Sequence, residues 1–144
     1  MARRRHDTGF TLLEIMIVVF IVGLLATLVT PRLMGRTDEA RRAKATADLA
    51  TFAQALDLYR LDSGVYPTTP QGLGALATRP TTPPLPAKWR EGGYVDQVPA
   101  DPWGNAYVYV SPGDANPQGY DLVSYGADGQ PGGEGEDADI TSWQ

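Results

Sequence analysis

The first third of the chain is dominated by one apolar run. From Phe10 to Val29 the only charged residue is Glu14, and the run follows a basic segment at Arg3–Arg5. A helix needs roughly 20 apolar residues to cross a hydrocarbon layer about 30 Å thick, and this run has that length. The pattern therefore predicts a transmembrane helix over residues 10–30. Arg3–Arg5 favour a cytoplasmic N-terminus, but basic residues also follow the run, so charge alone leaves the orientation open.

After the apolar run, hydrophobic positions recur as a helical stripe. Leu49, Phe52, Leu56 and Tyr59 are spaced by three, four and three residues, which is typical of an amphipathic helix with one buried face. We expect residues 31–63 to continue the transmembrane helix, so that one helix runs from Phe10 to about Leu61. Asp62-Ser63-Gly64 supplies its stop signal.

Two helix breakers lie inside this predicted helix. Gly23 weakens helical structure, and Pro31 lacks an amide donor and clashes with the preceding turn. The stretch between them is the expected place for a kink or for local unwinding. The alternative interpretation is that Gly23 packs against another helix and Pro31 marks the exit from the membrane.

From residue 64 to residue 144 the pattern changes to short elements separated by turns. A short helix is predicted with Thr69 as its cap and Pro70 at its first position. Residues 107–110 and 120–124 read as two strands joined by a turn. A two-stranded hairpin is marginal alone, so we expect a small antiparallel sheet with a third short strand, packed on the apolar face of the long helix. The predicted fold class is α+β.

Composition limits the chemistry available to the protein. The chain has no cysteine, and its only histidine is His6. No residue pattern supports catalysis, because Asp62, Asp101 and Asp121 are each expected to be turn caps or solvated groups. Trp103 and Trp143 are expected to be core anchors. The net charge of −5 is unfavourable for nucleic-acid binding, which requires clustered cations.

An acidic, glycine-rich segment lies near the C-terminus. Between residues 128 and 139 it holds four glycines, Pro131 and five carboxylates: Asp128, Glu134, Glu136, Asp137 and Asp139. Such a loop repels itself unless a cation gathers it, and ligands that are all oxygens favour calcium. It is not an EF-hand, because Gln130 and Gly132 occupy the third and fifth loop positions when Asp128 is counted as the first. A disordered acidic tail is the alternative on composition alone.

The start of the apolar run, Gly9-Phe10-Thr11-Leu12-Leu13-Glu14, resembles the processing site of type IV pilins and their relatives. The resemblance implies that a prepilin peptidase cleaves after Gly9, removes residues 1–9 as a leader and methylates the amine of Phe10. It also implies that Glu14 neutralises the N-terminal amine of a neighbouring subunit. Loss of Arg3–Arg5 and Asp7 would change the net charge from −5 to −7. An ordinary signal peptide would instead place its cleavage site after a shorter apolar run.

Several motifs in the remainder of the chain resemble the major pseudopilins of type II secretion systems, and the similarity extends from Gly9 to Trp143. They are Leu61–Thr69 with Gln71-Gly72-Leu73, Asp101-Pro102-Trp103-Gly104-Asn105, Ser124-Tyr125-Gly126-Ala127-Asp128-Gly129, and Asp137–Ile140 with Trp143. Tyr125 departs from the leucine usual in that family.

The resemblance implies a pilin-like fold with one calcium ion in the acidic loop. The implied ligands are the side chains of Asp128 and Asp139, then that of Asp137, and the backbone carbonyl of Tyr125. It also implies that the helix between Gly23 and Pro31 can unwind when subunits pack into a filament.

The expected function is structural rather than enzymatic. The resemblance implies a single-pass protein of the bacterial inner membrane, with its head in the periplasm, that polymerises with copies of itself into a periplasmic pseudopilus. Growth of that filament would help to drive folded proteins across the outer membrane. The implied partners are the prepilin peptidase, minor pseudopilins and an inner-membrane secretion platform. The alternatives are a subunit of an adhesive or DNA-uptake fibre and, more distantly, an enzyme on an uncleaved anchor.

Overall fold

One long helix organises the chain. The computed structural model describes residues 10–143, and the side chains of residues 28–36 lie outside that description. Helix α1 spans Leu12–Ser63. It ends as the sequence predicts: the Gly64 amide donates to the Arg60 carbonyl (2.7 Å), and Gly64 adopts a φ of 84° that closes the helix without steric cost.

Two compact units divide the chain, Met1–Thr37 and Asp38–Gln144, and α1 contributes to both. In the described part of the first unit, every large apolar side chain from Phe10 to Leu25 is at least 48% exposed. Among the residues that the structure describes, no helix combines the length and the apolar character needed to span a membrane. The last residues of the predicted span, 28–30, have side chains outside the described set.

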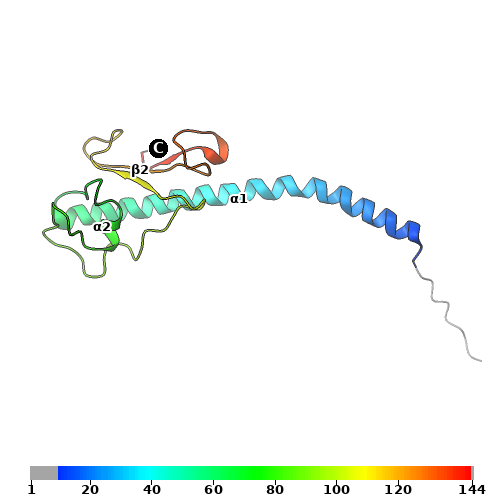
Figure 1. Cartoon of the computed structure of the whole chain (residues 1–144), viewed down its shortest axis with the longest axis horizontal. Helices are drawn as coiled ribbons and strands as arrows, with labels where there is room; N and C mark the ends of the chain where they lie inside the picture. The colour runs from blue at the N-terminus through cyan, green and yellow to red at the C-terminus, as the bar shows by residue number, and fades with distance from the viewer. Residues whose placement is uncertain (1–9, 144) are drawn as a thin grey trace, which may run out of the picture. The chain divides into compact units, whose positions relative to one another are not determined.

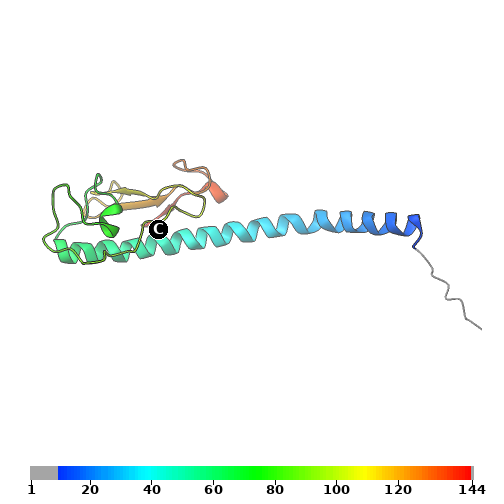
Figure 2. The ribbon, with the colours of Figure 1, turned by 60° about the horizontal axis from the view of Figure 1, so that its bottom comes forward.

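The second unit is built on one face of α1. Five of its buried side chains are spaced by four, three, four and three residues, as expected for a single helical stripe: Ala45, Leu49, Phe52, Leu56 and Tyr59. Ala55, beside Leu56, is also buried and widens the stripe. The four-residue stripe predicted from the sequence is confirmed, and Ala45 extends it by one turn. Figures 1 and 2 show the sheet and the loop segments lying along this part of α1.

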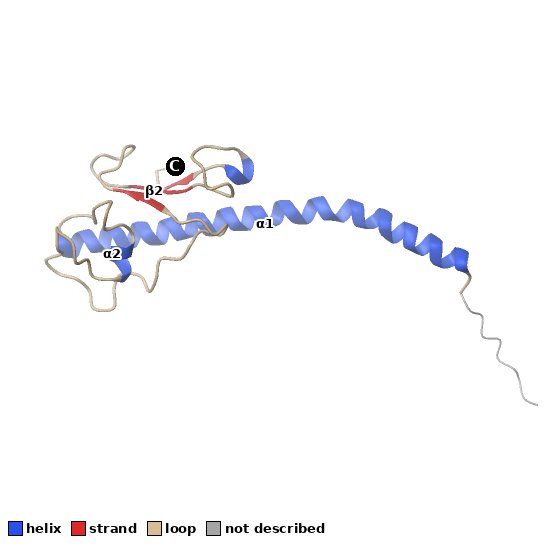
Figure 3. Cartoon of the chain, viewed as in Figure 1, coloured by secondary structure: helices blue, strands red, loops and turns tan. Residues whose placement is uncertain are grey.

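Three short strands form the sheet. Strands β1 (Val108–Val110), β2 (Asp121–Ser124) and β3 (Ile140–Thr141) pair antiparallel in the order β1-β2-β3 (Figure 3). Tyr109 lies opposite Leu122, and Ser124 lies opposite Ile140. The predicted hairpin with a third strand is confirmed. The second strand is buried along its whole length because it lies between the other two.

The predicted short helix begins later than expected. Helix α2 spans Gly74–Ala77, and residues 69–73 form turns. The prediction that Thr69 caps this helix is wrong, because its hydroxyl is engaged elsewhere: it donates to the Ser111 carbonyl (3.1 Å) and accepts the Ser111 amide (2.9 Å). Thr69 therefore ties the segment before α2 to the residue that follows β1.

The two predicted tryptophan anchors behave differently. Trp103 packs against the core, whereas Trp143 is 47% exposed. The prediction that Trp143 is a core anchor is therefore wrong. Strand β3 ends at Thr141, and Ser142 is still bound to β2: its amide donates to the Leu122 carbonyl (2.9 Å) and its hydroxyl accepts the Leu122 amide (3.2 Å).

Burial on α1 gives a direct test of this packing. We expect Leu56→Ala, at a fully buried position, to lower the free energy of unfolding by about 2 to 5 kcal/mol, because it removes apolar contacts and leaves a cavity. Leu58→Ala is the matched control: the same change at a side chain that is 39% exposed should cost less than about 1 kcal/mol. Urea denaturation of a fragment comprising residues 38–144 measures both. Equal losses for the two variants would contradict the assigned core face.

Candidate functional sites in the helix and the acidic loop

Glu14 lies in the first turn of α1. Its backbone amide donates to the Thr11 hydroxyl (3.2 Å), and the Ile15 amide donates to the Thr11 carbonyl (3.3 Å). Thr11 is thus the helix cap, and Thr11 and Glu14 have the spacing of a capping box. This cap explains why α1 begins at Leu12 rather than at Phe10. The Glu14 carboxylate sits in the helix turn next to Phe10, whose side chain is 78% exposed.

The remaining residues predicted for processing and assembly are only partly described. The leader, residues 1–9, and the cleavage point after Gly9 lie outside the described residues. Gly23 is helical, and a Cβ placed on it would meet no atom within 4 Å. Pro31 is within α1, but its side chain is not described. The helix is continuous through both positions, and unwinding between them stays a prediction.

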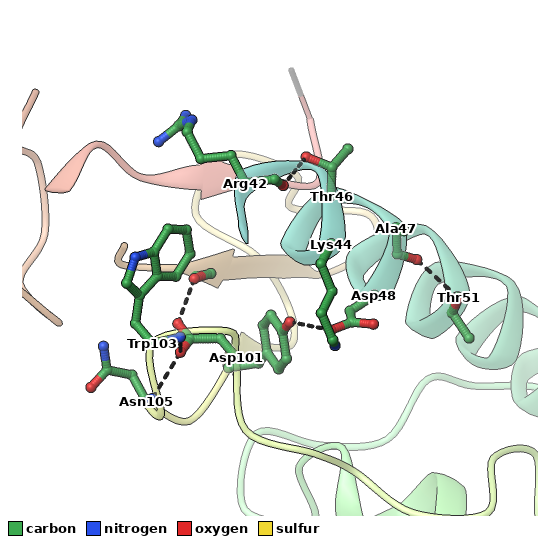
Figure 4. Close-up of polar contacts among 11 residues, drawn as sticks. Arg42, Lys44, Thr46, Ala47, Asp48, Thr51, Asp101, Trp103 and Asn105 are labelled. Atoms are coloured by element: carbon green, nitrogen blue, oxygen red, sulfur yellow. Dashed lines mark hydrogen bonds and ion pairs between the residues drawn. The ribbon is translucent and has the colours of Figure 1, made fainter. Parts of the chain in front are cut away.

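A buried polar junction holds the start of the acidic loop. The Asp101 side chain, 5% exposed, accepts the amides of Trp103 (3.1 Å) and Asn105 (2.8 Å) through Oδ1. Its Oδ2 accepts the hydroxyl of Ser124 at the end of β2 (2.6 Å). Figure 4 shows Asp101 turned toward the backbone of Asn105. Asp101 is therefore a fully engaged turn carboxylate, as the sequence interpretation of a cap predicts.

Asn105 extends this junction into the acidic loop. Its side-chain amide donates to the Gly126 carbonyl (2.9 Å) and thereby braces the turn that follows β2. Sequence reasoning did not assign this role to Asn105 or to Ser124. A signal for the turn was present, because an Asp-Pro pair favours turn initiation. The partner of Asn105, the Gly126 carbonyl, lies 21 residues further along the chain and had no such signal.

The two ends of the acidic loop approach closely at two glycines. The Ala127 amide donates to the Glu136 carbonyl (3.0 Å). A Cβ on Gly126 would lie 2.9 Å from the Asp137 carbonyl oxygen, and one on Gly133 would lie 2.5 Å from the same atom. No side chain fits at either position. The Asp137 carbonyl is therefore held in a cradle of bare backbone.

The predicted calcium ligands are distributed over this loop. Asp128 Oδ1 accepts the Gln130 amide (3.0 Å), and Asp139 Oδ2 accepts the Gly132 amide (2.9 Å). The other oxygen of Asp139, Oδ1, is buried and has no hydrogen-bond partner. Tyr125 and Asp139 line one cavity of about 310 Å³ beside the sheet, whereas Asp128 and Asp137 do not line it.

The structure does not gather the acidic side chains into one cluster. Within residues 10–143, no three carboxylate or other metal-binding side chains converge on a common point. The loop thus presents one unsatisfied carboxylate oxygen, a capping carboxylate at Asp128 and several backbone carbonyls. Carboxylate and carbonyl oxygens are the donors that calcium accepts.

Arg42 makes a contact that sequence reasoning missed. Its Nη1 donates to the carbonyls of Gly135 and Ala138, each at 3.0 Å. These carbonyls flank η1 (Gly135–Asp137), the 3-10 turn in the acidic loop. The sequence offers no signal that distinguishes Arg42 from its neighbour Arg41, which instead pairs with Asp38 on α1 (3.4 Å).

The exposed end of the loop brings two carboxylates together. Protonated Glu136 donates a hydrogen bond to the Asp38 carboxylate, which raises the pKa of Glu136; a small burial effect and the charge of Asp38 act in the same direction. The nearby Arg41 lowers that pKa but does not cancel the shift. Glu136 therefore holds a proton to higher pH in the folded protein than in the unfolded chain.

Comparison with known proteins identifies the family of this chain. A family model described as type II secretion system (T2SS), protein G, matches residues 32–143, and the prokaryotic N-terminal methylation motif matches residues 4–30. The chain belongs to the type II secretion system protein G family. The resemblance predicted from the sequence is thereby confirmed.

This chain matches curated relatives over nearly their full length. The type II secretion system core protein G of Vibrio cholerae serotype O1 is 53% identical over 143 residues, which cover 99% of this chain and 96% of that protein. The core protein G of Pseudomonas aeruginosa is 50% identical over 141 residues and is covered to 98%.

A solved structure also matches this chain. The crystal structure of the major pseudopilin from the type 2 secretion system of enterohaemorrhagic Escherichia coli superposes with a TM-score of 0.66 at 45% identity. The match covers 78% of this chain and 95% of that one. A pilin-like arrangement, with a long N-terminal helix and a small antiparallel sheet, is therefore shown.

The carboxylate pair predicts a pH effect. Because the pKa of Glu136 is raised from 4.5 on folding, the folded state binds the extra proton, and stability falls as pH rises through the shifted pKa. When the pH is raised from about 4 to about 7, we expect the melting temperature of Glu136→Gln to fall by less than that of the wild type. Thermal unfolding of residues 38–144 in chelator measures this. Glu134→Gln, on the same loop, should follow the wild type; if Glu136→Gln also does, Asp38 and Glu136 are not coupled.

Proposed function

We propose that this chain is the major structural subunit of a type II secretion pseudopilus. It assembles with copies of itself into a periplasmic filament whose growth from the inner membrane helps to drive folded proteins across the outer membrane. The observation that carries the proposal is that the same chain matches the N-terminal methylation motif over residues 4–30 and the protein G family over residues 32–143.

Exposed apolar surface supports the anchoring and assembly role of α1. Large side chains from Phe10 to Leu25 are exposed on every face of the helix, far beyond the apolar patch of a typical soluble monomer. Such surface requires a surrounding phase or partner. In the proposed cycle the inner membrane covers it first, and equivalent helices of neighbouring subunits cover it in the filament.

Glu14 supplies the recognition element within that surface. A carboxylate among apolar side chains costs about 2.5 to 3.5 kcal/mol near a bilayer centre, so its retention favours a charged partner. After cleavage behind Gly9 by the prepilin peptidase, the methylated amine of Phe10 on a neighbouring subunit provides the opposite charge. Attraction between the two groups is strengthened by the low dielectric of the helix bundle.

Calcium fits the acidic loop on two observations. Asp139 Oδ1 is buried without a partner, and the cradle formed by Gly126 and Gly133 leaves the Asp137 carbonyl without a covering side chain. In this proposal Asp139, Asp128 and the Tyr125 carbonyl are ligands, and Asp137 contributes through its carbonyl or its side chain. Bound calcium would link oxygens from both ends of the loop and offset the repulsion among its carboxylates.

The remaining partners follow from the assembly. The head lies in the periplasm, so the filament contacts minor pseudopilins at its tip and the inner-membrane secretion platform at its base. An adhesive or DNA-uptake fibre is the competing function. It predicts long surface fibres or a transformation defect in place of a secretion defect.

Glu14 provides the functional test. In cells that lack this gene we expect secreted proteins to accumulate in the periplasm, wild-type chain to restore secretion, and Glu14→Gln not to restore it, because the buried charge pair is lost. Glu39→Gln, an exposed glutamate on the same helix, is the matched control and should restore secretion. Secretion assays and the mass of the N-terminal peptide, which reports cleavage and methylation, are the measurements. Full secretion by cleaved Glu14→Gln would overturn the role of Glu14, and normal secretion without the gene would overturn the function.

Asp139 provides the test of the metal. Calcium at about 100 times its dissociation constant should stabilise the wild type by about 2.7 kcal/mol, or several degrees in melting temperature. Asp139→Asn should abolish the shift, since an asparagine oxygen can still accept the Gly132 amide but carries no charge. Glu134→Gln removes a loop charge and should keep the shift. The melting temperature of each variant, measured with calcium, with magnesium and with chelator, tests this. If calcium shifts the melting temperature of Asp139→Asn as much as that of the wild type, Asp139 is not a ligand.

A further inference from the structure

One side chain of α1 holds the acidic loop across more than 90 positions of sequence. Arg42 Nη1 donates to Gly135 O and to Ala138 O, each at 3.0 Å. Both hydrogens of that nitrogen are thereby used, which fixes the guanidinium relative to the loop backbone. Figure 4 shows the Arg42 side chain leaving α1 on the side of the faint red C-terminal ribbon.

The two accepted carbonyls lie at the ends of a short turn. Between them η1 carries Glu136 and Asp137, and Asp139 follows directly after Ala138. Arg42 therefore fixes the turn that presents the Asp137 carbonyl and the segment that leads into Asp139. They include the buried Asp139 Oδ1, which has no hydrogen-bond partner, and the Asp137 carbonyl, which lies close to Gly126 and Gly133.

Arg42 also carries a charge that opposes a nearby cation. A positive group beside a calcium site disfavours binding by simple repulsion, whereas a positive group that orients carbonyl ligands favours it. The contacts of Arg42 favour the second effect, the orientation of carbonyl ligands. Both hydrogen bonds of Arg42 go to backbone carbonyls at 3.0 Å, and no ion pair to a loop carboxylate is among its contacts in the described structure.

We propose that Arg42 is a positioning residue that straps the acidic loop to α1 and thereby raises the affinity of the loop for a divalent cation. The inference rests on the proposed calcium site and adds a residue outside the loop to it. It links cation binding to the part of α1 that carries the sheet, because Arg42 lies one turn from the buried Ala45.

The test uses the full-length mature chain in detergent, titrated with calcium by calorimetry. We expect Arg42→Gln to weaken calcium binding by about 10- to 100-fold, the range typical of residues that orient metal ligands. Arg41→Gln is the matched control: it removes the same charge one residue away, from an exposed side chain that lies near Glu136 but hydrogen-bonds to Asp38 rather than to the loop backbone, and it should bind calcium at least as tightly as the wild type. Arg42→Lys keeps the charge on a shorter side chain and should also bind more weakly.

A second readout separates this inference from the calcium proposal. Hydrogen exchange in chelator should show faster exchange of the Asp137 and Ala138 amides in Arg42→Gln than in the wild type, with unchanged exchange in the core of α1. If the wild type does not bind calcium, the calcium site fails, and this exchange alone decides whether the strap exists. If the wild type binds and Arg42→Gln binds equally well or more tightly, the role of Arg42 is overturned.

Discussion

The apolar stripe on α1 is the constraint on which the head depends. Its strands have three, four and two residues, which is too little hydrogen bonding and too little apolar area to be stable as an isolated sheet. Leu56, Tyr59 and Leu122 are almost fully buried where the helix and the sheet meet. The Tyr107 hydroxyl, which donates to Asp48 on α1 (2.8 Å), adds a polar link, and burial together with Asp48 raises the pKa of that tyrosine. The helix is therefore the scaffold of the second unit and also carries Glu14, the residue to which the proposed function assigns a role in assembly.

The second level of organisation is polar and supports the acidic loop from outside. Asp101 satisfies two amides and the Ser124 hydroxyl, Asn105 reaches the Gly126 carbonyl, and Arg42 reaches the far end of the loop. The bonds from Ser124 to Asp101, from Asn105 to Gly126 and from Arg42 to Gly135 each join residues more than 20 positions apart, so loss of one partner leaves the other polar group unpaired. The loop itself has almost no apolar content. Its conformation is thus imposed by contacts with the helix and with the Asp101 turn.

Periodicity predicted the parts of this structure that arise from local rules. The stripe from Leu49 to Tyr59, the stop at Gly64 and the strand pair follow from spacing, from glycine at a helix end and from β-rich runs between turns. The cap assigned to Thr69 failed because Ser111, distant in sequence, uses the same hydroxyl. The contacts of Asn105 and Arg42 had no local signal at all, since nothing in a charge cluster indicates which arginine meets a backbone carbonyl. Residues 1–9, and the unwinding between Gly23 and Pro31, stay predictions from the resemblance.

Towards each end of the described chain there are groups that no other described group of the same chain covers or pairs. At the N-terminal end, large apolar side chains are exposed around a helix whose first turn holds one carboxylate. At the other end, a buried carboxylate oxygen of Asp139 lacks a partner in a loop of like charges. In the proposed function, a second copy of the chain, cleaved after Gly9, would supply both apolar surface and a cation at the N-terminal end, and calcium would supply the missing partner of Asp139. A subunit that depends on both would reach its full stability only after assembly and calcium binding, as expected of a protein that polymerises.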